Sequence, residues 1–339
     1  SRQSNLSDMP SKSLSLTVRM VAAISGLAVV TVGFLVGIWA VLYGVLSFFD
    51  VSPASSLAAG ITALTIVTVG YLEYRQIDTI ERVADAQRVD REAEPALYDL
   101  VTRIASQIGI PVPTIALSER QTPEALAVGF RPGNVHLILS RGTLNALDGT
   151  AELEAVIAHE LAHVKNRDAM VMTIVSLPVI LAFGLGSRLA DVENPGWAAI
   201  VIVPLAFIST LVWGLGNAIT ARLSRVREHA ADQAAADITG SPAALASALK
   251  RLDQDISETP NRDLREASGI SSLSILPLEP EELDKVMLGP EGDTEPSYWW
   301  LRTRLHRFER WLFRTHPPTD DRIEQLAAYE RSQERHPAP

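Results

Sequence analysis

Four long stretches without a charged residue constrain the fold of this chain more than any other feature. The stretches cover residues 20–49, 52–72, 169–187 and 197–221. A helix of roughly 20 apolar residues crosses the hydrocarbon core of a bilayer, which is about 30 Å thick. Each stretch is long enough to do so, and the mean hydropathy of +0.13 is high for a protein without membrane segments. The sequence therefore predicts two transmembrane hairpins, at residues 20–75 and 169–221.

Charges beside the first hairpin predict its orientation. Lys12 and Arg19 precede it and Arg75 and Arg82 follow it, whereas the only charge in the connection between its helices is Asp50. Because Lys and Arg accumulate on the cytoplasmic side of membrane proteins, both ends of the hairpin are expected in the cytoplasm. We therefore expect a multi-pass protein of the plasma membrane, with both termini and the polar domain cytoplasmic.

The polar segments predict one domain that is interrupted by the second hairpin. Its two parts are residues 76–168 and 222–330, and polar tails flank the whole at 1–19 and 331–339. The expected fold class is a mainly α membrane protein, with four transmembrane helices and a cytoplasmic domain that contains a small sheet.

Local patterns indicate the elements of the polar domain. Apolar residues recur at helical spacing through residues 76–109. Three short runs, at 114–118, 125–129 and 134–140, have the length and composition of strands. Thr150 is expected to cap the helix that follows.

Composition excludes several classes of function. The formal net charge is −10, which is unfavourable for binding nucleic acid. The chain contains no cysteine, so disulfides, thiolate zinc sites and cysteine nucleophiles are excluded. A transition-metal site in this chain must therefore use His, Asp or Glu as ligands.

One short motif points to metal chemistry. Residues 155–168 read AVIAHELAHVKNRD, in which His159 and His163 are four residues apart with Glu160 between them. On a helix, residues four apart share a face, so both imidazoles can bind one metal ion while Glu160 lies beside it. Such a site keeps a position for water, from which the carboxylate can remove a proton during attack on a carbonyl carbon. This is the pattern of a zinc peptidase.

A third metal ligand is expected directly after the fourth apolar stretch. Residues 222–237 are helix-forming and place Glu228 and Asp232 one turn apart. Glu228 can complete a set of two histidines and one glutamate. Asp232 can accept a hydrogen bond from the far nitrogen of one of these histidines. His229 is an alternative third ligand, although on a helix it points about 100° away from Glu228.

Together these motifs resemble the HtpX family of membrane-bound zinc metalloproteases. The segments HELAHVKNRD and SRVREHAAD, separated by two apolar stretches, occur in the family's order. The segment THPPTDDRI at residues 315–323 is similar to the family's C-terminal His-Pro element. The resemblance covers the chain from about residue 60 to residue 330. It implies a zincin-like α+β protease domain that holds one Zn²⁺ per chain.

The resemblance also implies a role for each matching residue. It assigns three zinc ligands, namely His159, His163 and Glu228. Glu160 corresponds to the general base, and Asp232 to a carboxylate that supports a ligand histidine. His316 and Arg322 match residues that lie near the active site in such enzymes, where either can bind the substrate backbone or the developing oxyanion.

The chain departs from the family in places that bear on its substrate. The family usually has Asn-Ala-Phe-Ala ahead of its substrate-binding edge strand, whereas residues 124–127 of this chain read EALA. We expect the strand near 134–140 to be that edge and to pair with an extended substrate. Residues 255–312 match the family least. They contain an acidic, proline-rich loop and an aromatic, arginine-rich segment, which we interpret as a helix that packs or contacts the membrane surface.

The sequence therefore predicts an endopeptidase that hydrolyses unfolded or misfolded membrane proteins through a zinc-activated water, with Glu160 as the base. Protein quality control is implied by the resemblance alone. The predicted partners are these substrates and the lipid bilayer, and the sequence does not indicate an oligomeric state. Two alternatives stay open: a CaaX-type prenyl protease, which carries a similar motif, and a noncatalytic membrane scaffold or chaperone that keeps the zinc fold.

Overall fold

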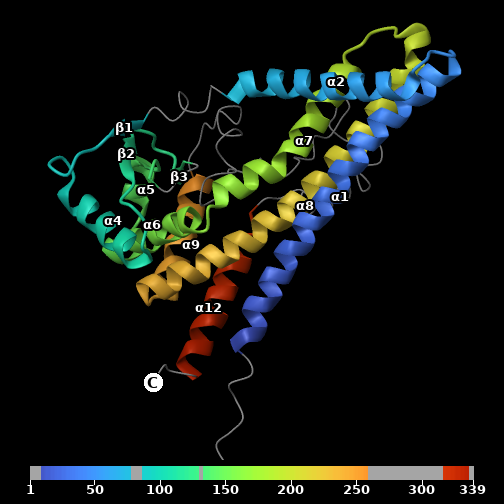
Figure 1. Cartoon of the computed structure of the whole chain (residues 1–339). Helices are drawn as coiled ribbons and strands as arrows, with labels where there is room; N and C mark the ends of the chain where they lie inside the picture. The colour runs from blue at the N-terminus through green and yellow to red at the C-terminus, as the bar shows by residue number, and fades with distance from the viewer. Residues whose placement is uncertain (1–8, 78–85, 130–132, 259–315, 336–339) are drawn as a thin grey trace, which may run out of the picture. The chain divides into compact units, whose positions relative to one another are not determined.

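The computed structural model describes residues 9–77, 86–129, 133–258 and 316–335. The chain divides into two compact units. The apolar unit comprises Ser1–Arg82 with Val171–Val226, and the mixed unit comprises Val83–Met170 with Arg227–Pro339. The helices and strands are drawn in Figure 1, and most of them are labelled there.

The apolar unit consists of long helices. They are α1 (Met9–Phe48), α2 (Ala54–Ile77), most of α7 (Asp168–Ala190), the short 3-10 helix η1 (Gly196–Ala198) and the first part of α8 (Ala199–Thr239). Four helical segments within the described residues are long and apolar enough to cross a membrane. This confirms the expected mainly helical fold with four candidate membrane helices.

Packing within the apolar unit is consistent with a lipid environment. Helices α1 and α8 lie side by side (Figure 1), and a Cβ atom at Gly37 would come within 3.2 Å of the Ile208 side chain. Glycine therefore allows the two backbones to approach closely, as is common between membrane helices. Many large apolar side chains of this unit point outward, including Val29 at 72% exposure and Phe207 at 69%. Contiguous apolar surface of this kind is rare on soluble proteins.

The mixed unit contains a four-stranded sheet. Its strands are β1 (Ala86–Arg88), β2 (Thr114–Ser118), β3 (Ala125–Val128) and β4 (His136–Ser140). The spatial order is β1-β2-β4-β3, with β2 and β4 parallel and the other two pairs antiparallel. Strand β3 is therefore an edge strand of the sheet within the described residues.

Within the described residues, five further helices and the last part of α8, from Arg227 to Thr239, complete the mixed unit and share one core with the sheet. The five helices are α4 (Pro95–Ile108), α5 (Arg141–Ala146), α6 (Thr150–Lys165), α9 (Pro242–Glu258) and α12 (Thr319–Arg335). Helix α4 buries an apolar stripe that includes Leu97, Val101 and Ile104, as its sequence spacing predicts, and it ends at Gly109, whose φ of 72° favours glycine. The core buries apolar residues of all these elements except α5, and α6 lies within it, against α4, β3 and α9.

The three predicted strands are confirmed, but three other expectations about local structure are wrong. Residues 76–109 do not form a helix throughout, because 86–88 pair with β2 as strand β1 and Pro95 begins a separate helix. Backbone pairing with a neighbouring strand overrides a weak helical pattern. The N-cap of α6 is Gly149 rather than Thr150, and the backbone N–H of Asp148 is satisfied by the Glu152 carboxylate at 2.7 Å.

The third correction concerns the edge of the sheet. The strand near 134–140, which we expected at the edge, is β4, and it is paired on both sides, by β2 and by β3. The edge on the side of α6 is instead β3, which contains most of the segment that departs from the family pattern. Which of two adjacent short strands lies outermost depends on pairings that are distant in sequence. The predicted loop and helix at 255–312 lie outside the described residues, apart from the end of α9.

Candidate metal centre and active site

Helix α6 presents both histidines of the motif on one face. His159 is fully buried and the His163 side chain is 19% exposed. Their Nε2 atoms are 3.1 Å apart. Two nitrogens that bind one tetrahedral Zn²⁺ at about 2.0–2.1 Å would be separated by about 3.3 Å, so the observed spacing is close to that of a shared metal ion.

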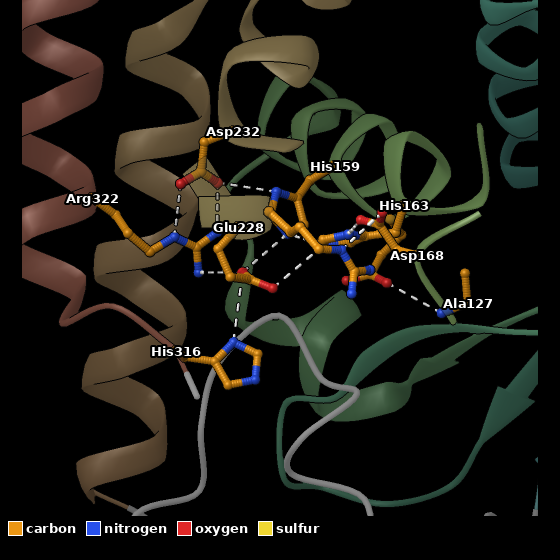
Figure 2. A network of polar contacts seen from close by, with 10 residues as sticks. Ala127, His159, His163, Asp168, Glu228, Asp232, His316 and Arg322 are labelled. Atoms are coloured by element: carbon orange, nitrogen blue, oxygen red, sulfur yellow. Dashed lines mark hydrogen bonds and ion pairs between the residues drawn. The ribbon is translucent and has the colours of Figure 1, made fainter. Parts of the chain in front are cut away.

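Helix α8 brings a carboxylate to the same point. Oε2 of Glu228 lies 3.6 Å from Nε2 of His159, and Oε1 lies 3.5 Å from Nε2 of His163. One donor atom from each of the three residues lies within 4.8 Å of the other two. The three side chains converge from two different helices, as Figure 2 shows. The arrangement offers one carboxylate and two imidazoles to a single cation.

Each imidazole is held by a carboxylate at its other nitrogen. Nδ1 of His159 is 3.0 Å from Oδ1 of Asp232, and Nδ1 of His163 is 2.6 Å from Oδ2 of Asp168. A proton on Nδ1 that faces a carboxylate leaves the lone pair of Nε2 free to bind a metal. Both Nε2 lone pairs then face the Glu228 carboxylate. The donor set therefore fits Zn²⁺, which prefers these ligand types and this oriented form of histidine.

Arginine side chains hold the two supporting carboxylates. Arg322 of α12 donates to both oxygens of Asp232, at 2.9 and 2.6 Å, and its Nη1 is 3.6 Å from Oε2 of Glu228. Nε of Arg227 forms an ion pair with Oδ1 of Asp168 at 2.9 Å. Asp168 and Arg227 were not predicted from the sequence. Asp168 is the last residue of the HELAHVKNRD segment, which is the one sequence feature that could have indicated it. It follows His163 by five residues, and this spacing does not bring two residues together on a helix.

Glu160 is buried next to the edge strand. The residue is 2% exposed, and its Oε2 accepts a hydrogen bond from the backbone N–H of Ala127 in β3 at 3.1 Å. Burial raises the pKa of Glu160 to about 8, with a further contribution from the charge of Glu228. A carboxyl group with a pKa near neutrality can take up and return a proton at physiological pH.

His159 also has a shifted pKa in the metal-free protein. Burial alone lowers it, but the carboxylates of Asp232 and Glu228 close to its two nitrogens outweigh this effect and raise the pKa of His159 to about 9. A bound cation would take the place of the proton on Nε2.

The remaining predicted residues lie at different distances from the centre. His316 is 2% exposed, and its Nδ1 lies 3.5 Å from Oε2 of Glu228. Its Nε2 is buried without a hydrogen-bond partner in the described part of the chain. His229, the alternative ligand, instead contacts the Gln325 amide at 3.3 Å and is not one of the three clustered groups. The structure thus brings Glu228 to the two histidines and turns His229 away.

A small pocket adjoins the centre. His163, Asp168 and Arg167 line one side, and Ala127 and Gly129 of the β3 segment line another. The pocket thus lies between the edge strand and the second histidine of the motif.

Comparison with known proteins identifies the family. The model of Peptidase family M48 matches residues 91–330. Protease HtpX homolog 1 of Streptomyces coelicolor is 31% identical over 331 residues, which cover 96% of each chain. The chain belongs to peptidase family M48. As an M48 peptidase with relatives named protease HtpX, it is a metalloprotease and a membrane protein, which confirms the resemblance noted in its sequence.

Other relatives agree with this M48 assignment. Protease HtpX homolog 2 of Methanosarcina acetivorans is 39% identical over 199 residues, covering 57% of this chain and 66% of the relative. The protease HtpX homolog of Acidiphilium cryptum is 36% identical over 248 residues, covering 71% and 76%. Among solved structures, S. mikatae Ste24p aligns with a TM-score of 0.46 and 17% identity, over 84% of this chain and 61% of that one.

Proposed function

We propose that this M48 peptidase is a zinc endopeptidase that binds one Zn²⁺ through His159, His163 and Glu228. The observation that carries the proposal is the convergence of their donor atoms, with each imidazole held at Nδ1 by a carboxylate. When bound, zinc supplies a Lewis acid for the scissile carbonyl and lowers the pKa of a water molecule at the site.

Glu160 is the proposed general base. It takes the proton of the attacking water and returns it to the leaving amine. Its position supports this role, because the carboxylate follows His159 on α6 and is held by the Ala127 N–H. The same hydrogen bond places the base beside the edge strand on which a substrate would lie.

We assign substrate pairing to β3. The N–H of Ser140 donates to the carbonyl of Glu124 at 2.9 Å, so Glu124 and Ser140 form a hydrogen-bonded pair. Hydrogen-bonded and non-bonded pairs alternate along an antiparallel ladder. The backbone groups of Ala125 and Ala127 therefore point away from β4, toward the free edge. The backbone groups of Ala125 and the carbonyl of Ala127 can pair with an extended substrate and hold its scissile bond beside Glu160, while the Ala127 N–H keeps its hydrogen bond to the Glu160 carboxylate.

His316 and Arg322 have different proposed roles. Nε2 of His316, which has no hydrogen-bond partner among the described residues, can donate to the developing oxyanion. Both oxygens of Asp232 are bonded to Arg322, which supports an indirect role for this arginine through the orientation of His159.

The proposed substrates are unfolded or misfolded membrane proteins, and the proposed location of the active site is the cytoplasmic side of the plasma membrane. The sidedness rests on the basic residues around the first hairpin. Because the chain contains no cysteine, one introduced cysteine can be labelled selectively. An impermeant maleimide added to intact cells should label Asn194→Cys and not Glu330→Cys. The reverse pattern would place the active site outside.

The decisive experiment compares wild-type enzyme with Glu160→Gln and Glu228→Ala on an unfolded membrane protein. Glu160→Gln should keep stoichiometric zinc and lose cleavage, because the ligands remain while the base is absent. Glu228→Ala should lose both zinc and cleavage, and a chelator should inhibit the wild type. Full activity of Glu160→Gln would refute the mechanism. Cleavage of a prenylated CaaX peptide in preference to the unfolded protein would favour the prenyl protease alternative.

A further inference from the structure

A carboxylate and an arginine lie behind the second histidine of the motif. Oδ2 of Asp168 is 2.6 Å from Nδ1 of His163, and Oδ1 is 2.9 Å from Nε of Arg227. One oxygen thus serves each partner. Figure 2 labels Asp168 next to His163. The side chains of Asp168 and Arg227 are each only 8% exposed. Water therefore cannot readily replace either contact.

The chain turns sharply between α6 and α7, and this turn makes the contact between Asp168 and His163 possible. Helix α6 ends at Lys165, and Arg167 has a φ of 56°, in the left-handed region that residues other than glycine rarely adopt. On a continuous helix, a residue five positions after His163 would lie about 140° away around the axis. The turn at Arg167 returns the chain, so that Asp168, the first residue of α7, faces His163. The conformation has an energetic cost, which points to a specific role for the residue that it positions.

We propose that Asp168 and Arg227 are positioning residues of the metal centre. Asp168 keeps the proton of His163 on Nδ1 and fixes the plane of the ring, so that Nε2 faces the metal. Arg227 holds the second oxygen of Asp168 and thereby fixes the direction of its carboxylate. Arg227 directly precedes Glu228 on α8, so one helix positions both the third ligand and the support of the second. The inference rests on the proposed zinc site.

Metal retention distinguishes this role from simple helix packing. Zinc should be measured in the purified full-length protein by its rate of transfer to a chromophoric chelator. Asp168→Ala should weaken zinc binding by about 10–100-fold, the usual cost of removing a partner of a ligand histidine. Arg227→Met should have a smaller effect in the same direction, and Arg227→Lys should recover part of it. The absorption spectrum of the Co²⁺-substituted protein should also change in Asp168→Ala, because the geometry at His163 changes.

A matched control is available in the same unit. Arg251 of α9 pairs with the carboxylate of Glu152 at 3.1 Å, and this pair does not contact either histidine. Arg251→Met should lower the melting temperature and leave both zinc release and the Co²⁺ spectrum unchanged. An equal acceleration of zinc release in Arg251→Met would mean that general destabilisation is responsible, and would overturn the proposal.

Other outcomes separate this inference from the proposed zinc site. Wild-type zinc release from folded Asp168→Ala, with an unchanged Co²⁺ spectrum, would overturn the inference alone, provided that Glu228→Ala loses zinc. Retention of zinc by Glu228→Ala would instead refute the zinc site. If Asp168→Ala does not fold, Asp168→Asn and Arg227→Lys serve in its place, and wild-type zinc release from both would overturn the inference.

Discussion

The two histidines of the motif differ in what lies behind them. Behind His159, Asp232 is 3% exposed and both of its oxygens are bonded to a fully buried Arg322. Behind His163, Asp168 divides its oxygens between the histidine and Arg227, and the histidine side chain is 19% exposed beside a pocket. The same three residue types are thus used once with both carboxylate oxygens on the arginine, and once with the carboxylate divided between arginine and histidine beside a pocket.

This difference predicts which contacts stabilise the fold and which mainly affect metal binding. Removing one partner of a buried ion pair leaves an uncompensated charge in the core, which is strongly destabilising. Asp168 instead gives one oxygen to Arg227, and these two side chains are slightly more exposed, at 8% each, than Asp232 and Arg322, at 4% and 0%. We therefore expect the Asp232 pair to control stability as well as zinc binding, and the Asp168 pair to affect zinc binding more than stability.

The largest expected effect separates the two carboxylates. Asp232→Ala should lower the free energy of unfolding of the metal-free protein by about 3–5 kcal/mol, because Arg322 loses its closest partner in the core. Asp168→Ala should cost less, about 1–2 kcal/mol. Denaturant unfolding of both variants in the same detergent measures the difference. Equal losses would contradict the distinction between a pair joined through both carboxylate oxygens and a pair joined through one.

A double substitution can separate stability from function at the pair of Asp232 and Arg322. Asp232→Leu combined with Arg322→Met replaces two charges with apolar groups and should recover most of the stability that either single change loses. Zinc affinity should stay about 10–100-fold below wild type, because His159 has no carboxylate to orient it. Calorimetry and zinc titration of the single and double variants provide the measurement. Recovery of zinc affinity in the double variant would show that Asp232 does not orient the ring.

A pH series reports on His159. Its pKa is raised to about 9, so its contribution to the stability of the metal-free protein is fully present below about pH 6.5 and is lost as pH rises through 9. Glu160 acts in the same direction between about pH 4.5 and 8, because its raised pKa makes the protonated form the stable one. Unfolding free energies of wild type and Glu160→Gln separate the two groups. A decline between pH 6.5 and 9 should persist in Glu160→Gln, and a flat profile would exclude the raised histidine pKa.

The smallest expected effect tests the turn at Arg167, which positions Asp168. Asp232, in contrast, lies within the continuous helix α8 and is not positioned by a turn. Arg167→Gly should stabilise the metal-free protein by about 1 kcal/mol, because glycine adopts a positive φ without strain. Arg167→Val should destabilise it and also weaken zinc binding, since a β-branched residue resists this conformation and would displace Asp168. Thermal unfolding and zinc release measure both effects. Weakened zinc binding in the glycine variant would show that the Arg167 side chain itself contributes to the centre.

The parts of the site that could be predicted from sequence are those in which one helix supplies both members of a contact. His159 with His163, and Glu228 with Asp232, are each four residues apart, so helical periodicity places them on one face. Asp168 and Arg227 were not predicted. Asp168 reaches its position through a turn with an unusual backbone angle, and its contact with Arg227 joins two helices. Sequence spacing carries no information about either feature.

The fold follows the same rule, in that its local patterns were predicted and its long-range pairings were not. Four apolar stretches and the helix of the motif are long, local patterns, and the structure contains each of them. The order of the strands depends on which segments of four or five residues pair with one another. This pairing puts β3 rather than β4 at the edge. Strand β1, with three residues, exists only because β2 provides its hydrogen-bond partners.

The position of Arg322 in the chain has a consequence for biosynthesis. A ribosome releases the helix with the HExxH motif long before it reaches α12, which supplies the cation for Asp232. Until α12 has been made and has docked, the carboxylate behind His159 lacks its fixed orientation. The proposed zinc site is therefore completed late in translation. A protease with the proposed preference for unfolded chains would gain from this delay, because its own nascent chain is unfolded during the same period.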